Sequence, residues 1–269
     1  MPEETKRPAR SEMRGIRLLR IFSQAFAGLT LPPLTRPYDT PRTPKTKAIV
    51  QWGICIYAYS VVSHFGRLVR GLITLAEDGN AAATAPIARH IFEWTAATSY
   101  LTEELRTHFE NQNWQAAWDV LGRFTLGSGW IKKWGGMYVD FDIEPNRGVP
   151  VPPKPGELVA SYQRYFDAEH YGKSALEKYS YLCDHSHTTS IVLTRYRHNP
   201  ISPEVTAFQL NPDEELFMSF LPSADMSLID AFKMFLTLLG LADERHLRQA
   251  ILATLHEIIA RKKEVESNA

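Results

Sequence analysis

The stretch that decides the fold is TKAIVQWGICIYAYSVVSHFGRLVRGLITLAE, which runs from Thr46 to Glu77 and is followed by Asp78, Gly79 and Asn80. Its apolar side chains recur every three or four residues, which is the spacing of one face of an α-helix. Gly79 and Asn80 are typical residues for ending one helix and starting another. The stretch therefore predicts one long helix that ends in a tight turn.

The following segment, from about Ala81 to Phe109, keeps the helical spacing and predicts the second half of a helical hairpin. Pro86 is tolerated near the start of this helix if Thr84 serves as its N-cap. Further helices are predicted over residues 113–124, 157–187, 225–241 and 243–263. The fold class is therefore mainly α, a helical bundle built on the long hairpin.

Two insertions interrupt the helical pattern of a single domain that spans residues 48–269. The first, near residues 127–156, is rich in Gly and Pro, and Val139, Phe141 and Ile143 alternate with polar residues as in a short strand. The second, near residues 188–225, has β-branched residues on either side of an Asn-Pro pair and predicts a second hairpin or an extended excursion. These segments are the minor β decoration of the helical domain.

Residues 1–47 form the one clearly basic segment, with ten Lys and Arg residues against four Asp and Glu residues. It contains a helical apolar pattern followed by a proline-rich stretch, so it predicts an N-terminal arm and linker. Two interpretations remain open, an arm that packs on the domain and a basic arm that binds an acidic or nucleic-acid partner. The whole chain has a formal net charge of zero, so no global positive field points to nucleic acid or an anionic membrane.

Residues 48–66 carry no Asp, Glu, Lys or Arg and approach the length of a membrane span. Four polar residues interrupt this stretch: Gln51, Ser60, Ser63 and His64. The sequence therefore favours a buried core helix and predicts no membrane contact. The two cysteines, Cys55 and Cys183, are too few for a secreted disulfide framework, and no secretory apolar region follows the first basic residues, so we expect a cytoplasmic protein.

A candidate site comes from two helices that are far apart in the sequence. Arg89, Glu93 and Tyr100 fall on one face of the hairpin's second helix, and Tyr179 and His187 fall on one face of a later helix. If the two faces meet, Arg89 could bind a phosphate, His187 could exchange a proton and Glu93 could orient one of them. The alternatives are a buried structural hydrogen-bond network or an exposed ion pair.

Metal chemistry is a further alternative, because Asp184, His185 and His187 are metal-ligating residue types close to one another in the sequence, and His90 or Glu93 could join them. Their spacing does not force them to converge, and the paired Glu-x-x-His motif of di-iron bundles is absent. The sequence therefore predicts no metal and no other cofactor.

The same residues carry a family resemblance. The segment GNAAATAPIARHIFEWTAATSYL, followed by YSYLCDHSHTT, resembles an uncharacterised bacterial family of helical proteins with Arg-x-x-x-Glu on one helix and Tyr-x-x-Leu-Ser-x-x-x-His on a later helix. Those positions are here Arg89, Glu93, Tyr179, Leu182, Cys183 and His187. Cys183 replaces the serine of that pattern.

The helical layout of that family is in turn similar to the HEPN superfamily, many of whose members are metal-independent ribonucleases that act as dimers in toxin and phage-defence systems. The resemblance implies a homodimer that acts on RNA, with His187 as general acid or base, Arg89 on the phosphate, Glu93 as the orienting residue and Tyr179 as support. The arginine of the superfamily motif is absent before His187, so Arg89 would supply that charge from the other helix. The alternative function class is a non-catalytic helical module that binds a protein partner.

Overall fold

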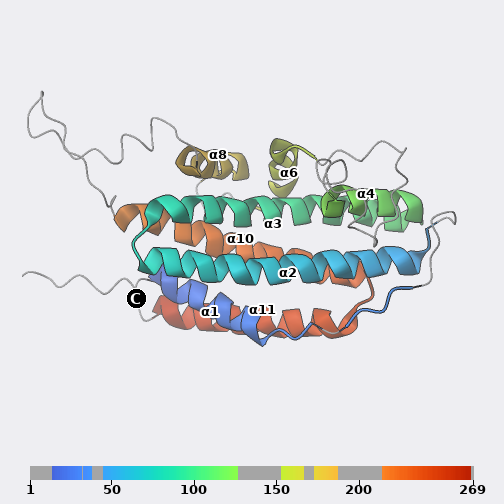
Figure 1. The fold of residues 1–269 in the computed structure, drawn as a ribbon, viewed down its shortest axis with the longest axis horizontal. Helices are drawn as coiled ribbons and strands as arrows, with labels where there is room; N and C mark the ends of the chain where they lie inside the picture. The colour runs from blue at the N-terminus through green and yellow to red at the C-terminus, as the bar shows by residue number, and fades with distance from the viewer. Residues whose placement is uncertain are drawn as a thin grey trace, which may run out of the picture.

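The computed structural model describes residues 14–31, 33–37, 45–126, 153–166, 173–186 and 214–267. Every regular element within these ranges is an α-helix, so the mainly α, bundle-like fold class is confirmed (Figure 1). The short strand predicted at residues 139–143 and the hairpin predicted within residues 188–213 lie outside the described residues.

The predicted hairpin consists of α2 (Lys47–Glu77) and α3 (Ala81–Glu110), which lie side by side in Figure 1. Thr46 caps α2, because its side-chain oxygen accepts a hydrogen bond from the backbone N–H of Ile49. Gly79 makes the turn with a φ of 80°, a left-handed conformation that glycine adopts without strain. At about 1.5 Å per residue, α2 alone is about 46 Å long and spans the whole bundle.

The N-cap predicted for the second helix is wrong. Asn80, and not Thr84, caps α3, and its side chain accepts a hydrogen bond from the backbone N–H of Ala83. Thr84 lies inside the helix with 0% of its surface exposed. Pro86 is therefore an interior proline that removes one backbone hydrogen bond, and the burial of neighbours such as Ala88 and Ile91 offsets this cost.

Helix α10 (Glu214–Leu241) packs against α3 behind the hairpin. The predicted start of this helix, at residue 225, is wrong, and the insertion predicted over residues 188–225 overlaps its first turns. By its local chemistry Pro222 predicts the end of a helix, but it lies inside α10. Its neighbours Phe220, Leu221 and Ala224 are completely buried. The burial of these side chains maintains the helix through the proline.

Helices α1 (Arg14–Gly28) and α11 (Arg245–Ser267) pack against each other on the side of α2 that faces away from α3 (Figure 1). Ile16, Leu19 and Phe22 of α1 are at most 1% exposed. Of the two interpretations of residues 1–47, packing on the domain therefore applies to α1, which is part of the same helical core.

Three shorter helices cover the outer face of α3 (Figure 1): α4 (Trp114–Leu126), α6 (Pro155–Tyr162) and α8 (Ala175–Ser186). With neighbours on both sides, α3 carries small buried side chains instead of a single apolar stripe. The Thr95 hydroxyl, for example, lies 2.9 Å from the carbonyl oxygen of Ile91 and 3.1 Å from that of Ser227. These contacts tie α3 to α10 without a large side chain between them.

Helix α6 is fixed by what we call the Glu103 cluster, which consists of Glu103, Ser161, Arg164 and Tyr165. The Glu103 carboxylate accepts hydrogen bonds from Ser161 Oγ at 3.0 Å, Arg164 Nη1 at 3.0 and 3.1 Å, and Tyr165 Oη at 3.1 Å. On the inner side, the buried Tyr162 hydroxyl donates to Asp230 of α10 over 2.7 Å. These bonds place α6 firmly on α3 beside α8.

Within the described ranges, α2 is the one helix long and apolar enough to cross a membrane, and 61% of its most apolar window is buried inside the protein. This burial agrees with the core helix that the sequence favours.

Candidate functional site

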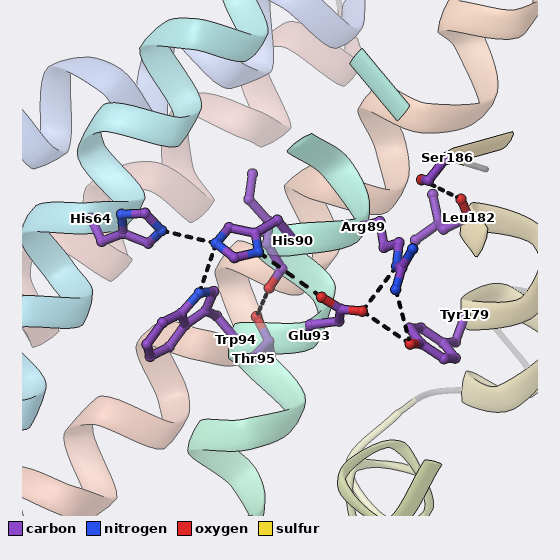
Figure 2. A network of polar contacts seen from close by, with 10 residues as sticks. His64, Arg89, His90, Glu93, Trp94, Thr95, Tyr179, Leu182 and Ser186 are labelled. Atoms are coloured by element: carbon purple, nitrogen blue, oxygen red, sulfur yellow. Dashed lines mark hydrogen bonds and ion pairs between the residues drawn. The ribbon is translucent and has the colours of Figure 1, made fainter. Parts of the chain in front are cut away.

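The candidate site lies where α8 crosses α3, and three of its four predicted residues meet there (Figure 2). Arg89 Nε donates to Glu93 Oε1 over 2.9 Å, and the Tyr179 hydroxyl donates to the same oxygen over 3.0 Å. Arg89 Nη2 lies 3.5 Å from the Tyr179 hydroxyl. The side chains of Arg89 and Glu93 are 20% and 25% exposed, so the group is largely buried but still reaches solvent.

The sequence of α8 explains how Tyr179 reaches α3. Ser174 and Glu177 form reciprocal hydrogen bonds that begin the helix, an arrangement known as a capping box. Leu182, five residues after Glu177, is completely buried and fixes the rotation of the helix. The ring of Tyr179 then stacks on Phe92 with ring centroids 6.2 Å apart. The guanidinium carbon of Arg89 also lies over the Tyr179 ring, 5.7 Å from its centre.

Two histidines and a tryptophan extend this group toward α2 (Figure 2). His90 Nε2 accepts a hydrogen bond from Trp94 Nε1 over 2.9 Å and lies 3.1 Å from His64 Nε2. On its other side, His90 Nδ1 lies 3.9 Å from Glu93 Oε2. A continuous line of polar side chains therefore runs from α2 across α3 to α8, and we name His64, Arg89, His90, Glu93 and Tyr179 the Glu93 cluster.

Both histidines of the cluster favour the neutral form. Burial, followed by the neighbouring His90 and Arg67, lowers the pKa of His64. Burial also lowers the pKa of His90, where Arg89 adds to the effect and Glu93 opposes it. Since the Trp94 indole can only donate, Nε2 of neutral His90 is an acceptor and its proton is on Nδ1, toward Glu93.

The arginine and the tyrosine keep their protons. Burial raises the pKa of Tyr179, and so do its hydrogen bonds with Cys183 and Glu93, so this phenol remains a donor at neutral pH. Burial works against the charge of Arg89, but the adjacent Glu93 carboxylate outweighs it and the pKa of Arg89 is raised. The site therefore combines a permanent positive charge, a carboxylate, a neutral imidazole and a phenol.

The other residues that the sequence predicts for the site lie outside the described residues or against a different helix. His187 lies outside the described residues, and so does the side chain of His185. Tyr100, which the helical period places on the face of Arg89, packs against Phe124 of α4 with ring centroids 5.9 Å apart. The helical period sets the direction in which the Tyr100 side chain points. Because Tyr100 lies about 10 Å farther along α3 than Glu93, however, the helix opposite it is α4 and not α8. Among the described side chains, no three His, Cys, Asp or Glu residues group as metal ligands.

His64 is the residue of the cluster that sequence reasoning missed, because it was treated only as a polar interruption of α2. The hairpin register contains the missing signal. Tyr57 on α2 contacts Thr98 on α3 over 3.1 Å, and moving about two turns toward the hairpin turn on both helices brings His64 to His90. A register drawn outward from the turn at Gly79 pairs His64 with Trp94, which contacts it with ring centroids 5.6 Å apart, and His90 lies one helical turn from Trp94.

A cavity of about 220 Å³ adjoins the cluster between α3, α4 and α6. His90 and Glu93 line its polar end, while Trp94, Phe124, Leu158 and Val159 are among its apolar walls. Glu93 thus belongs both to the cluster, where its Oε1 contacts Arg89 and Tyr179, and to the lining of the cavity.

Chemically, the arrangement can hold an anion next to groups that donate and accept protons. Comparisons of the chain with protein-family models, with curated proteins and with solved structures find no match. The geometry of the cluster therefore carries the functional argument.

Proposed function

We propose that the protein is a HEPN-like, metal-independent endoribonuclease, or an inactive relative of one, that acts through the Glu93 cluster. The observation that supports this proposal is the meeting of Arg89, Glu93 and Tyr179, which come from helices 86 residues apart along the chain, at distances of 2.9 to 3.5 Å. Such a convergence of Arg, Glu and Tyr beside a neutral histidine suits acid–base work on a phosphodiester.

In this proposal the ribose 2′-hydroxyl attacks the adjacent phosphorus as a base removes its proton. The bond to the 5′-oxygen breaks, and an acid returns a proton to that oxygen, leaving a cyclic phosphate and a free 5′-hydroxyl. Arg89 stabilises the additional negative charge on the phosphate oxygens, and Glu93 and Tyr179 hold the guanidinium in place. His187 is the proposed acid or base, and neutral His90 lies beside Glu93 as a second proton carrier.

The biological setting belongs to the same proposal. A homodimer with two clusters at one cleft, acting on RNA in the cytoplasm of a bacterium during stress or phage infection, fits this chemistry. Light scattering of the purified protein would test for the dimer.

One observation favours the alternative, a non-catalytic helical module that binds a protein partner. Arg89, Glu93 and Tyr179 bond to one another, so the cluster also acts as a clamp that holds α8 on α3. Partly buried polar groups that satisfy each other are common structural features. In this case substitutions would lower stability and change no reaction.

The deciding experiment is cleavage of total RNA and transfer RNA by purified protein in excess chelator. We expect Glu93→Gln and His187→Ala to reduce cleavage at least about 100-fold, the usual effect of removing an acid–base group. Glu103→Gln is the matched control, because Glu103 is also on α3 and also bonds an arginine and a tyrosine.

Equal cleavage by wild type, Glu93→Gln and His187→Ala would reject the proposed site. An absence of cleavage in every sample, combined with a loss of thermal stability in Glu93→Gln only, would favour the structural clamp.

A further inference from the structure

We propose that the cavity between α3, α4 and α6 binds a single nucleobase, whose edge meets Glu93 and His90 while its ring lies against Trp94 and Phe124. This inference rests on the proposed function for its ligand class, because a nuclease must hold the nucleotide next to the phosphate that it cleaves. The cavity itself and its polar end are properties of the structure alone.

The size and walls of the cavity fit one flat ring. A cavity of about 150 Å³ lined by apolar side chains holds a benzene molecule. The cavity here is about 220 Å³, so it has room for one larger ring with polar substituents. Trp94 and Phe124 contribute aromatic surface to the walls, and bases stack on aromatic side chains without regard to sequence.

The polar end of the cavity has one acceptor and one donor side by side. Glu93 Oε1 already accepts from Arg89 and Tyr179, whereas the contact of Oε2 among the described residues is His90 Nδ1, at 3.9 Å. This distance is too long for a hydrogen bond, so Oε2 keeps its capacity to accept. His90 carries its proton on Nδ1 and can donate next to it.

Nucleobases present the complementary pair. Each base has an N–H donor next to an acceptor on its Watson–Crick edge, for example N3–H and O4 of uracil, and proteins read unstacked bases through this edge. A ring without a donor would leave the partly buried Glu93 carboxylate facing an apolar group, which is unfavourable. The cavity therefore selects heteroaromatic rings over purely apolar ones.

Glu93 also connects the base site to the phosphate site. Its Oε1 holds Arg89, the proposed phosphate ligand, while its carboxylate lines the cavity. Because the Watson–Crick edge of a base points away from its sugar, the phosphate at Arg89 would belong to another nucleotide of the same strand and not to the nucleotide whose base fills the cavity.

The test measures binding of uridine 5′-monophosphate to the full-length protein by saturation-transfer NMR and calorimetry. Two control ligands are used: ribose 5-phosphate, which lacks the base, and N3-methyluridine 5′-monophosphate, which lacks the donor. We expect both controls to bind at least about tenfold more weakly, because each leaves Glu93 Oε2 without a donor. Binding of a non-cleavable oligothymidylate is also compared with binding of free thymidine 5′-monophosphate. This comparison shows whether the cavity prefers a base within a strand or the base of a free nucleotide.

Two variants fill the cavity. Ala97 lines it from α3 and is 9% exposed, and Leu158 lines it from α6 and is half-buried, so Ala97→Phe and Leu158→Phe each place a ring in the space. We expect either variant to abolish nucleotide binding, and Leu158→Phe keeps the test valid if Ala97→Phe does not fold. Ala253→Phe on the exposed face of α11 is the matched control and should bind like wild type.

Equal binding of uridine 5′-monophosphate and ribose 5-phosphate, or binding that survives both cavity-filling variants, would overturn the base site. The nuclease activity and the base site are rejected by different results. Base binding without RNA cleavage would reject the nuclease and keep the site, and cleavage without base binding would reject the site alone.

Discussion

Helix α3 carries two carboxylates, Glu93 and Glu103, that have the same kinds of partner and very different surroundings. Each accepts hydrogen bonds from an arginine and a tyrosine, and each holds a shorter helix on α3. In the Glu103 cluster Arg164 is 72% exposed, whereas in the Glu93 cluster Arg89 is 20% exposed. The Glu93 cluster also contains two histidines and adjoins a cavity.

The comparison shows that residue types alone do not define a site. An exposed guanidinium stays hydrated, so an ion pair with a carboxylate adds little to its stability. A partly buried guanidinium has lost part of its hydration, and the paired carboxylate must compensate its charge. Burial also makes the imidazole neutral and the phenol a permanent donor. The Glu103 cluster is therefore a structural control that the molecule itself provides for the Glu93 cluster.

The largest difference in stability is expected from Arg89→Ala. This change leaves the Glu93 carboxylate, 25% exposed, with the Tyr179 hydroxyl as its donor, whereas Glu103, 23% exposed, keeps two donors, Ser161 and Tyr165, when Arg164 is removed. We expect the free energy of unfolding to fall by about 1–3 kcal/mol, the usual cost of an unpaired polar group at such a position. Urea denaturation followed by circular dichroism measures it, and a loss no greater than that of Arg164→Ala would mean that the two clusters are energetically alike.

A smaller difference is expected between Tyr179→Phe and Tyr165→Phe. The Tyr179 hydroxyl bonds Glu93 and lies within reach of Arg89, so its removal should cost about 1 kcal/mol. Glu103 keeps Ser161 and Arg164 as donors when the Tyr165 hydroxyl is removed, so we expect about half that cost. Thermal unfolding of the two single variants tests the order, and a larger loss for Tyr165→Phe would reverse it.

The dependence of stability on pH should also separate the clusters. The folded-state pKa values of His64 and His90 are lowered by burial, so between these values and the ordinary value of about 6.5 the unfolded chain binds more protons. The stability that comes from keeping His64 and His90 neutral is therefore fully present above about pH 6.5, and it is lost as the pH falls through their lowered pKa values. Arg67, Arg89 and Glu93 are the charged groups that act on the pair.

We therefore expect the fall in melting temperature between pH 7.5 and pH 5 to be smaller in the double variant His64→Gln, His90→Gln than in wild type. His246→Gln, at an exposed position outside the cluster, is the matched control variant. An unchanged slope in the double variant would show that the two histidines titrate alike in the folded and unfolded chains.

The smallest effect is expected from Arg164→Ala. A pair with a 72% exposed arginine contributes at most about 0.5 kcal/mol, and salt screens it. The difference from wild type should disappear in 0.5 M sodium chloride. A loss above about 1 kcal/mol at that salt concentration would show that Arg164 stabilises α6 by packing its aliphatic chain.

Much of this architecture follows from the sequence because it depends on local rules. The long hairpin is fixed by helical periodicity and by the turn at Gly79, and the helical phase places Arg89 and Glu93 on one face, whereas their contact with Tyr179 depends on the packing of α8 on α3. The phase gives the direction of a side chain but not the element that lies opposite. For this reason Tyr100 shares the face of Arg89 in the helical pattern but packs against Phe124 of α4.

The remaining differences come from interactions that a single segment does not contain. Pro222 and Pro86 are breakers by local chemistry, yet the burial of their neighbours keeps α10 and α3 helical. The charges of α1 predict an arm, but its buried face, with Ile16 and Phe22, decides its place in the core. The pairing of His64 with His90 required the register between two helices and not the period of one.

The packing of α1 against α11 has a consequence for synthesis of the chain. α1 is made early and α11 is made late, and each covers apolar surface of the other and of α10. Until residues 245–267 have left the ribosome, the apolar faces of α1 and α10 lack part of their cover, and such surfaces are prone to aggregation. The helical core is therefore complete only after α11 has been synthesised, although α1 is made more than 200 residues earlier.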